Sequence, residues 1–324
     1  MKIKNLEFSN CVLSSGSMNW FGDGYFYHDL YKKLFPCFKI VEQTSFVAKT
    51  TTLHYNAGRM PWKDNFRPRE LFPKCIKVYF FRHGGMVLNA VSLSGPGAQC
   101  LFDTDRWQNL NRSFAISFMA IGATKKERLK EAFDFVRLAA YELLHYPSRI
   151  WFQINVSCPN TAHDTGELAE EALEILELFQ LLSHRGYVID LKINSLMPLE
   201  TIVAIEKSGL CDILTVSNTI PFGTPDLGIQ WNKLFRRGQS PLSHLGGGGL
   251  SGAPILLSSL KKISQIRAAG VNMPIKGSGG ILTARDVLVM SRAGVDCIEI
   301  GAALMIRPWN VRSIIETAEQ VFSI

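Results

Sequence analysis

The 324-residue sequence lacks the signals that mark several classes of protein. It has no CxxC motif and no paired cysteine spacing, so neither a disulfide framework nor a zinc or iron–sulfur site is indicated, and a reducing cytosol is favoured. No run of about 18 apolar residues is present to span a bilayer, and the opening MKIKNLEFSN does not resemble a signal peptide. We therefore expect a cytoplasmic protein with no metal site and no membrane contact. The seven cysteines are Cys11, Cys37, Cys75, Cys100, Cys158, Cys211 and Cys297.

A long run of basic residues is also missing, although 35 Lys and Arg outnumber 28 Asp and Glu. Such an excess of positive charge can bind nucleic acid, anionic substrates or an acidic partner. Because basic and acidic residues interleave, as in RLKEAFDFVR, we interpret the charge as pointing to none of these in particular. No repeat, low-complexity tract or adenine dinucleotide fingerprint stands out, and we expect one domain over residues 1–324.

What the sequence does contain is an alternation of short β-rich apolar runs with amphipathic helical patterns. One helical pattern, TKKERLKEAFDFVRLAAYELL, opens with Thr124 and Glu127 in capping-box spacing. Other helical patterns cover residues 168–186, 283–294 and 310–322. The expected strands are residues 10–16, 38–45, 114–119, 149–157, 188–194, 212–218, 273–280 and 297–304.

Eight strands that each feed a helix predict an α/β fold of the (β/α)8 TIM barrel type. Two stretches exceed a simple strand–helix unit. Residues 50–97 predict an antiparallel excursion after the second strand, and residues 221–252 predict a long polar loop after the sixth. Long loops that follow barrel strands lie at the carboxyl face, where active sites are built.

Polar and glycine residues gather at the ends of the expected strands. The last two strands end in KGSGGI and EIGAAL, and glycine-rich turns at those positions favour a phosphate-bearing ligand, with plain tight turns as the alternative. Lys49 and Lys192 also end strands, where they are either solvated rim charges or partners of a ligand. Uncharged amides around one cavity suit a flat heterocycle with alternating C=O and N–H groups. Those amides are Asn89, Asn155, Asn160 and Asn218, the last followed by Thr219.

Cys158 follows the expected strand IWFQINV and precedes Pro159, which restricts the backbone beside it. One interpretation is an inert buried thiol, as for the other six cysteines. The other is a proton acceptor at the catalytic face, once a neighbour favours the thiolate. None of the seven histidines lies in a recognisable partner motif, so proton transfer fits better than acyl transfer.

Together, INVSCPNT, the two strand-end lysines, VSNT and the GSGG and IGAAL turns resemble dihydroorotate dehydrogenases over about residues 10–305. The cysteine form of the motif is similar to class 1, the soluble class, whereas the membrane-associated class has serine there and an added N-terminal helical segment. The resemblance implies FMN as cofactor and dihydroorotate and orotate as substrate and product. It also implies that Cys158 removes the C5 proton while a hydride passes from C6 to flavin N5.

The resemblance further implies a set of binding residues. For the pyrimidine and its carboxylate these are Lys49, Asn89, Asn155, Asn160, Asn218 and Thr219. For FMN they are Ser15, Gly16, Lys49, Thr50, Ser117, Asn155, Lys192, Ser217, Gly252, Gly279, Gly280, Gly301 and Ala302. Lys192 would stabilise the reduced, anionic flavin. The chain departs from the family at Ser92, where glycine is frequent, and at Ala302, where a hydroxyl residue is frequent, and NAGRMPWKDNFRPR follows the family's proline-rich loop only loosely.

Other functions are compatible with parts of the same pattern. A tRNA dihydrouridine synthase also uses a cysteine before proline, but it carries a further helical RNA-binding domain, so we expect no nucleic acid. A flavin barrel acting on another dihydropyrimidine, a non-redox phosphate-binding barrel and a scaffold subunit are the remaining alternatives. Without cluster-type cysteines, the chain would need either a small acceptor such as fumarate or an electron-transfer partner subunit. A homodimer is also left open.

Overall fold

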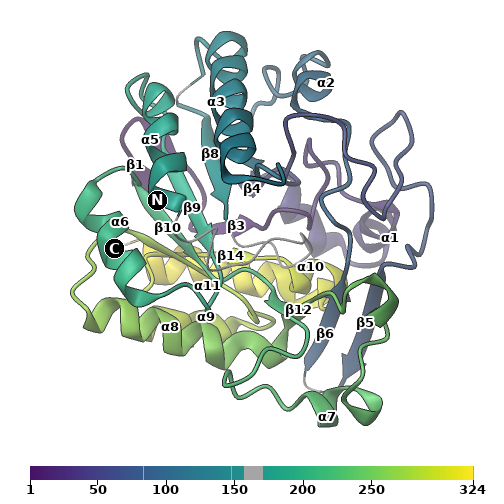
Figure 1. Cartoon of the computed structure of the whole chain (residues 1–324). Helices are drawn as coiled ribbons and strands as arrows, with labels where there is room; N and C mark the ends of the chain where they lie inside the picture. The colour runs from purple at the N-terminus through teal and green to yellow at the C-terminus, as the bar shows by residue number, and fades with distance from the viewer. Residues whose placement is uncertain (83, 147, 157–170, 324) are drawn as a thin grey trace.

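The computed structural model describes residues 1–82, 84–146, 148–156 and 171–323 (Figure 1). Its centre is a closed barrel in which every neighbouring pair of strands is parallel and β14 returns to pair with β3. The predicted (β/α)8 barrel is therefore confirmed. Its strands are β3 (Cys11–Leu13), β4 (Phe46–Val47), β7 (Phe114–Phe118), β8 (Ile150–Asn155), β9 (Ile189–Ile193), β10 (Ile213–Val216), β13 (Ile275–Ser278) and β14 (Cys297–Ile300).

The second strand was predicted at residues 38–45, and that position is wrong. Most of that segment belongs to the 3-10 helix η1 (Pro36–Glu42), and the barrel strand is the short β4 that follows it. Pro36 stands at the start of η1, where its missing N–H costs nothing. Phe38 and Val41 are its buried residues, and their spacing of three places both on one face of a helix with three residues per turn.

Helices surround the barrel, and two of them begin with the capping boxes that their sequences suggest. In α3, the Thr124 hydroxyl accepts a hydrogen bond from the Glu127 N–H at 3.2 Å, as predicted. In α9, Thr283 and Asp286 form the same arrangement. The α-helices are α1 (Phe26–Leu34), α2 (Ala98–Phe102), α3 (Lys125–Glu142), α5 (Ala172–Ser183), α6 (Leu199–Ser208), α7 (Trp231–Leu234), α8 (Leu256–Ala268), α9 (Ala284–Arg292), α10 (Ala302–Ile306) and α11 (Val311–Phe322).

The remaining elements are short. The 3-10 helices are η1, η2 (Arg236–Gly238), η3 (Ser243–Leu245), η4 (Ala253–Ile255) and η5 (Pro308–Asn310), and β1 (Lys2–Ile3) and β2 (Leu6–Glu7) form a hairpin. Leu6 of this hairpin packs in a buried cluster with residues at the amino ends of barrel strands, such as Val12 and Trp151. The hairpin therefore closes the end of the barrel opposite to the carboxyl face. Within the described ranges, no helix is long and apolar enough to cross a membrane.

A second, antiparallel sheet stands over the carboxyl face, and we call it the cap sheet. It contains β5 (Ile76–Phe81), β6 (Gly84–Asn89), β12 (Gly249–Gly252) and β11 (Ile220–Pro221), in the order β11-β12-β6-β5 (Figure 1). The excursion after the second barrel strand therefore is antiparallel, as predicted. The segment after the sixth strand, predicted as a long polar loop, supplies the other two strands, and β6 pairs with β12 to join the two segments.

Candidate functional site

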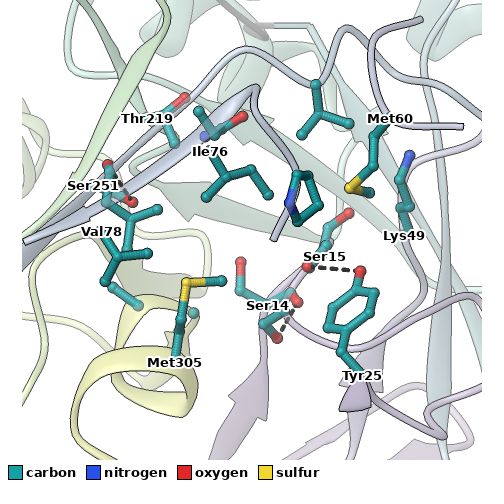
Figure 2. Close-up of a pocket in the computed structure, with 18 of the residues that line it drawn as sticks. Ser14, Ser15, Tyr25, Lys49, Met60, Ile76, Val78, Thr219, Ser251 and Met305 are labelled. Atoms are coloured by element: carbon teal, nitrogen blue, oxygen red, sulfur yellow. Dashed lines mark hydrogen bonds between the residues drawn. The ribbon is translucent and has the colours of Figure 1, made fainter. Parts of the chain in front are cut away.

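A single cavity of about 970 Å³ lies between the carboxyl ends of the barrel strands and the cap sheet. Figure 2 shows Ile76, Val78 and Met305 on one side of this cavity and Lys49 on the other. Most of the residues that the sequence proposed for binding line it, although they come from nine different strands or strand ends. They are Ser15, Gly16, Lys49, Thr50, Asn89, Asn155, Lys192, Ser217, Asn218, Thr219, Gly252, Gly279, Gly280, Gly301 and Ala302.

Among the described residues that the sequence proposed, Ser117 alone is not part of the cavity lining. Ser117 is buried behind Thr50, and their hydroxyl groups are 2.9 Å apart, so it supports the lining rather than forming it. Cys158 and Asn160 lie outside the described residues. Strand β8, which leads toward them, ends at Asn155, and the Asn155 side chain lies on the cavity wall.

The glycine turns after β13 have backbone shapes that only glycine adopts easily. Gly279 and Gly280 have φ of 92° and 87°, in the left-handed region. A Cβ on Gly280 would lie 2.6 Å from the backbone nitrogen of Leu256, so no side chain fits there. Both glycines and Gly301 line the cavity, and their bare backbone gives an anion close access to N–H groups.

Two asparagines on the cavity wall hold each other in place. Asn218 donates a side-chain hydrogen bond to the Asn155 amide oxygen at 3.1 Å, and its own amide oxygen accepts from the Thr219 N–H at 2.8 Å. Asn89 reaches across the cap sheet to the Gly249 carbonyl at 3.4 Å. These contacts fix the orientation of several uncharged donors and acceptors around the cavity, the arrangement that suits a flat heterocycle.

Lys49 is enclosed by two tryptophans that sequence reasoning did not find. Its ammonium group donates to the Ser94 carbonyl at 2.6 Å and lies 5.1 Å from the ring of Trp20 and 5.4 Å from that of Trp62. The Trp62 indole N–H donates to the same carbonyl at 3.1 Å. Cation–π contact stabilises the charge of the buried lysine. Trp20 lies in no segment that the sequence singled out, and Trp62 lies in the loosely matching NAGRMPWKDNFRPR, so only the fold shows that both reach Lys49.

The loop that follows β6 contains two consecutive residues in the left-handed region. Ser92 and Leu93 have φ of 58° and 54°. The Asn56 amide donates to both of their carbonyls, at 2.9 and 3.3 Å. Ser92 is the position where the resemblance has glycine, and its backbone keeps the conformation that glycine favours. Serine in place of glycine therefore does not change the shape of the turn. The hydrogen bonds from Asn56 compensate for part of the backbone strain at Ser92 and Leu93.

Beneath the cavity, the barrel interior holds a chain of buried charges in place of the usual branched apolar layers. Glu299 is in contact with Lys192 at 2.5 Å and with Lys276 at 2.9 Å, and Lys276 is 2.8 Å from Asp190. Gln153 donates to both carboxylates, at 3.0 Å to Asp190 and 2.9 Å to Glu299. We call these five residues the charge network. Its two positive and two negative charges balance.

The charge network shifts the pKa of two of its members, Glu299 and Lys276. Burial by itself raises the pKa of Glu299, but Lys192 and Lys276 outweigh burial and hold that pKa well below its ordinary value. Burial lowers the pKa of Lys276, yet Asp190 and Glu299 raise it above the ordinary lysine value. Glu299 and Lys192 both line the cavity, so the network places a lysine that is paired with a carboxylate at its floor.

Tyr25 and several apolar side chains complete the lining. The Tyr25 hydroxyl donates to the Gly16 and Met18 carbonyls, both at 3.1 Å, and so braces the turn after β3 (Figure 2). Ile76 and Val78 of β5 line the cavity together with Met305 of α10. The sequence assigned this segment to the antiparallel excursion but did not show that it lines the cavity.

The chain was compared with known proteins. The family model described as dihydroorotate dehydrogenase matches residues 73–322. The catalytic subunit of dihydroorotate dehydrogenase B (NAD(+)) from Shouchella clausii is 31% identical over 232 residues, which cover 71% of this chain and 70% of that one. The catalytic subunit of the same name from Halalkalibacterium halodurans is 28% identical over 237 residues, covering 72% and 71%.

Solved structures agree with this fold. A dihydroorotate dehydrogenase from Eimeria tenella, crystallised with ferulenol, superposes with a TM-score of 0.63 at 19% identity, covering 96% of this chain and 81% of that one. A ligand-free structure of the enzyme from the same organism gives 0.65 at 17% identity, covering 97% and 84%. At these identities the likeness concerns the fold alone.

Proposed function

The chain belongs to the dihydroorotate dehydrogenase family, and from this premise we propose that it oxidises dihydroorotate to orotate for pyrimidine biosynthesis, with Cys158 as the base. FMN is the cofactor of the family. The observation that carries the proposal is the convergence of the strand-end lysines, asparagines and glycine turns on one cavity. These residues are distant in sequence. Nothing in the packing of a barrel by itself requires them to meet, so their convergence indicates a binding site.

The cavity fits FMN at two points. The turn at Gly279 and Gly280 leaves no room for a Cβ and exposes backbone N–H groups, which suits the phosphate. At the floor, Lys192 is held in place by Glu299, and a lysine there suits the end of an isoalloxazine ring where negative charge develops on reduction. We propose Ser15, Gly16, Thr50, Ser217, Gly252, Gly301 and Ala302 as further contacts and Ser117 as a support behind Thr50.

When bound, FMN supplies the acceptor for the hydride from C6 of the substrate. The part of the chain itself is to bind and orient the pyrimidine and to take a proton. Asn89, Asn155 and Asn218 present amide groups whose orientation is already fixed, and Thr219 stands beside them. Lys49 offers a buried positive charge for the substrate carboxylate. We propose that Asn160 adds a further amide contact and that the Cys158 thiolate accepts the C5 proton.

The test begins with the colour of the purified protein. Bound FMN gives a yellow preparation with absorbance near about 450 nm, and a colourless protein that takes up no added FMN contradicts the proposal. Rapid mixing with dihydroorotate without oxygen should then bleach the flavin. In Cys158→Ala, we expect FMN and orotate to bind as before while bleaching slows by about 100-fold or more. Unchanged bleaching would remove Cys158 from the role of base.

The two relatives reported above are named as catalytic subunits of an NAD(+)-dependent enzyme. We propose that this chain likewise passes its electrons to a separate electron-transfer partner. The cytoplasmic location and the homodimer stay predictions. Mixing the reduced enzyme with fumarate, NAD or a quinone would show whether any small acceptor reoxidises it directly, and rapid reoxidation by one of them would contradict the need for a partner.

A further inference from the structure

The excess positive charge of the chain is confined to two segments. Residues 50–97 contain seven Lys and Arg against two Asp and Glu, and residues 221–252 contain three against one. Together these segments hold the whole formal net charge of +7, because the rest of the chain has 25 residues of each sign. Both segments contribute strands to the cap sheet. The charge that looked evenly spread in the sequence therefore belongs to the two segments that supply the cap sheet.

Part of this charge lies at the mouth of the cavity. Lys63, Lys74 and Lys77 all line it, together with one acidic residue, Glu70, and Arg69 is exposed on the same loop. Arg67 pairs with Asp29 at 2.7 Å. Within the described ranges, the three lysines take part in no ion pair. Their charge is therefore presented to whatever approaches the opening.

Exposed apolar side chains surround the same opening. Phe72 is 82% exposed, Phe80 63% and Leu71 61%, and all three line the mouth. Leu30 of α1 stands opposite them, at 49%. Single exposed apolar residues are common, but a cluster that continues into a cavity marks an interaction site. We call Lys63, Leu71, Phe72, Lys74, Lys77 and Phe80 the mouth face.

Strand β5 gives the mouth face an open edge. Its hydrogen-bonded neighbour in the cap sheet is β6, and β5 is the last strand in the order. Val78 and Phe80, which share one side of β5, line the cavity. An exposed edge strand with apolar side chains is a liability for a protein that stays alone, so its presence beside the opening indicates a surface that is covered in use.

We propose that the mouth face docks an electron-transfer protein whose own surface is acidic around an apolar centre. The inference rests on the proposed function. For each dihydroorotate oxidised, two electrons leave the cavity to the redox centre of this partner, and two protons go to solvent. An apolar centre with a charged rim is the usual anatomy of a protein interface, and opposite charge speeds the encounter. A second copy of this chain would oppose positive charge with positive charge.

Two small redox proteins of opposite charge can serve as probes. Plastocyanin, an acidic blue-copper protein, and cytochrome c, a basic haem protein, each accept one electron. The full-length enzyme is reduced with dihydroorotate without oxygen and mixed with either probe in a stopped-flow instrument. At low salt we expect plastocyanin to be reduced at least about tenfold faster than cytochrome c. Raising the salt concentration should bring the two rates together.

Matched variants locate the effect. Lys74→Glu combined with Lys77→Glu should slow plastocyanin reduction and speed that of cytochrome c. Lys207→Glu combined with Lys261→Glu makes the same change of charge on exposed positions of α6 and α8, outside the cavity lining, and should leave both rates within about twofold of the parent. Phe72→Ser should lower the rate with plastocyanin and leave its salt dependence unchanged.

Several outcomes would overturn the proposal. One is equal rates with the two probes at low salt, and another is an equal loss in the control pair. A third is that the protein binds vesicles containing phosphatidylglycerol through the mouth face but reduces plastocyanin no faster than cytochrome c. That result would show that the mouth face binds an anionic membrane. If dihydroorotate fails to bleach the flavin, the proposed function fails. Reduction by dithionite then still tests the docking face with the same two probes.

Discussion

Replacing Glu299 by glutamine tests whether the charge network holds the barrel together. The substitution keeps the size and the hydrogen-bonding shape of the side chain but removes one of two buried negative charges. Glu299 is fully buried and contacts both Lys192 and Lys276. In Glu299→Gln, Asp190 is the one carboxylate left in the network for Lys192 and Lys276. Asp190 contacts Lys276, so Lys192 loses its carboxylate partner in the network.

The expected loss of stability is large. Removing one partner of a buried ion pair costs about 3–5 kcal/mol, because the other charge stays desolvated without compensation. A whole domain is stable by only about 5–15 kcal/mol. The variant should therefore remain folded at neutral pH and unfold at a clearly lower urea concentration than the parent.

The pH dependence gives a second, independent signature. The pKa of Glu299 is lower in the folded protein than in the unfolded chain. Its contribution is therefore fully present above the unfolded value of about 4.3 and is lost as the pH falls through the folded value. The gap in unfolding free energy between parent and variant should be widest above about pH 5 and should narrow below about pH 4.

The assay is urea unfolding followed by tryptophan fluorescence, with the parent and the variants at the same FMN occupancy. Glu42→Gln is the matched control, since Glu42 pairs with Lys32 at 2.9 Å but its side chain is 54% exposed. We expect the control to cost at most about 1 kcal/mol. A Glu299→Gln variant as stable as this control, or a gap that does not narrow in acid, would refute the reasoning.

Three further outcomes follow from the site and its supports. Thr283→Ala removes the hydroxyl that caps the Asp286 N–H and should cost about 1 kcal/mol in urea unfolding, whereas Thr283→Ser should cost little. Gly280→Ala places a Cβ against the Leu256 backbone and should weaken FMN binding at least about tenfold by fluorescence titration; unchanged affinity would remove this turn from the phosphate site. Asn56→Ala frees the left-handed turn at Ser92 and should raise the KM for dihydroorotate more than it lowers kcat, and an effect on stability alone would contradict a role in substrate binding.

The positions of the strand-end residues could be predicted because a closed parallel barrel brings every strand's carboxyl end to one face. To predict that Lys49, Asn155 and Lys192 lie at this face, it was enough to recognise that each follows or ends a strand. The second strand was misplaced because the apolar pattern of residues 38–45 is equally compatible with a 3-10 helix, and the Pro36 start decided for the helix.

The charge network and the cap sheet could not be predicted in the same way. Gln153 and Glu299 are 146 residues apart and touch only because β8 and β14 face each other across the barrel. In the sequence, each of these polar residues stands alone within an otherwise apolar strand, so nothing indicates that they contact one another. The basic mouth face was missed for a different reason: the excess of Lys and Arg in residues 50–97 can be counted in the sequence, but only the fold shows that part of it lies at the opening of the cavity.

The pairing of β6 with β12 has a consequence for how the protein is made. Asn89 and Gly249, which pair across these strands, are 160 residues apart. At a synthesis rate of about 5–20 residues per second, the β5–β6 hairpin leaves the ribosome roughly 10–30 s before its partner strand exists. The opening of the cavity is therefore among the last parts of the molecule to take shape. Until then, a chain with an incomplete barrel exposes two unpaired strand edges, and this interval is when the nascent protein has most need of a chaperone.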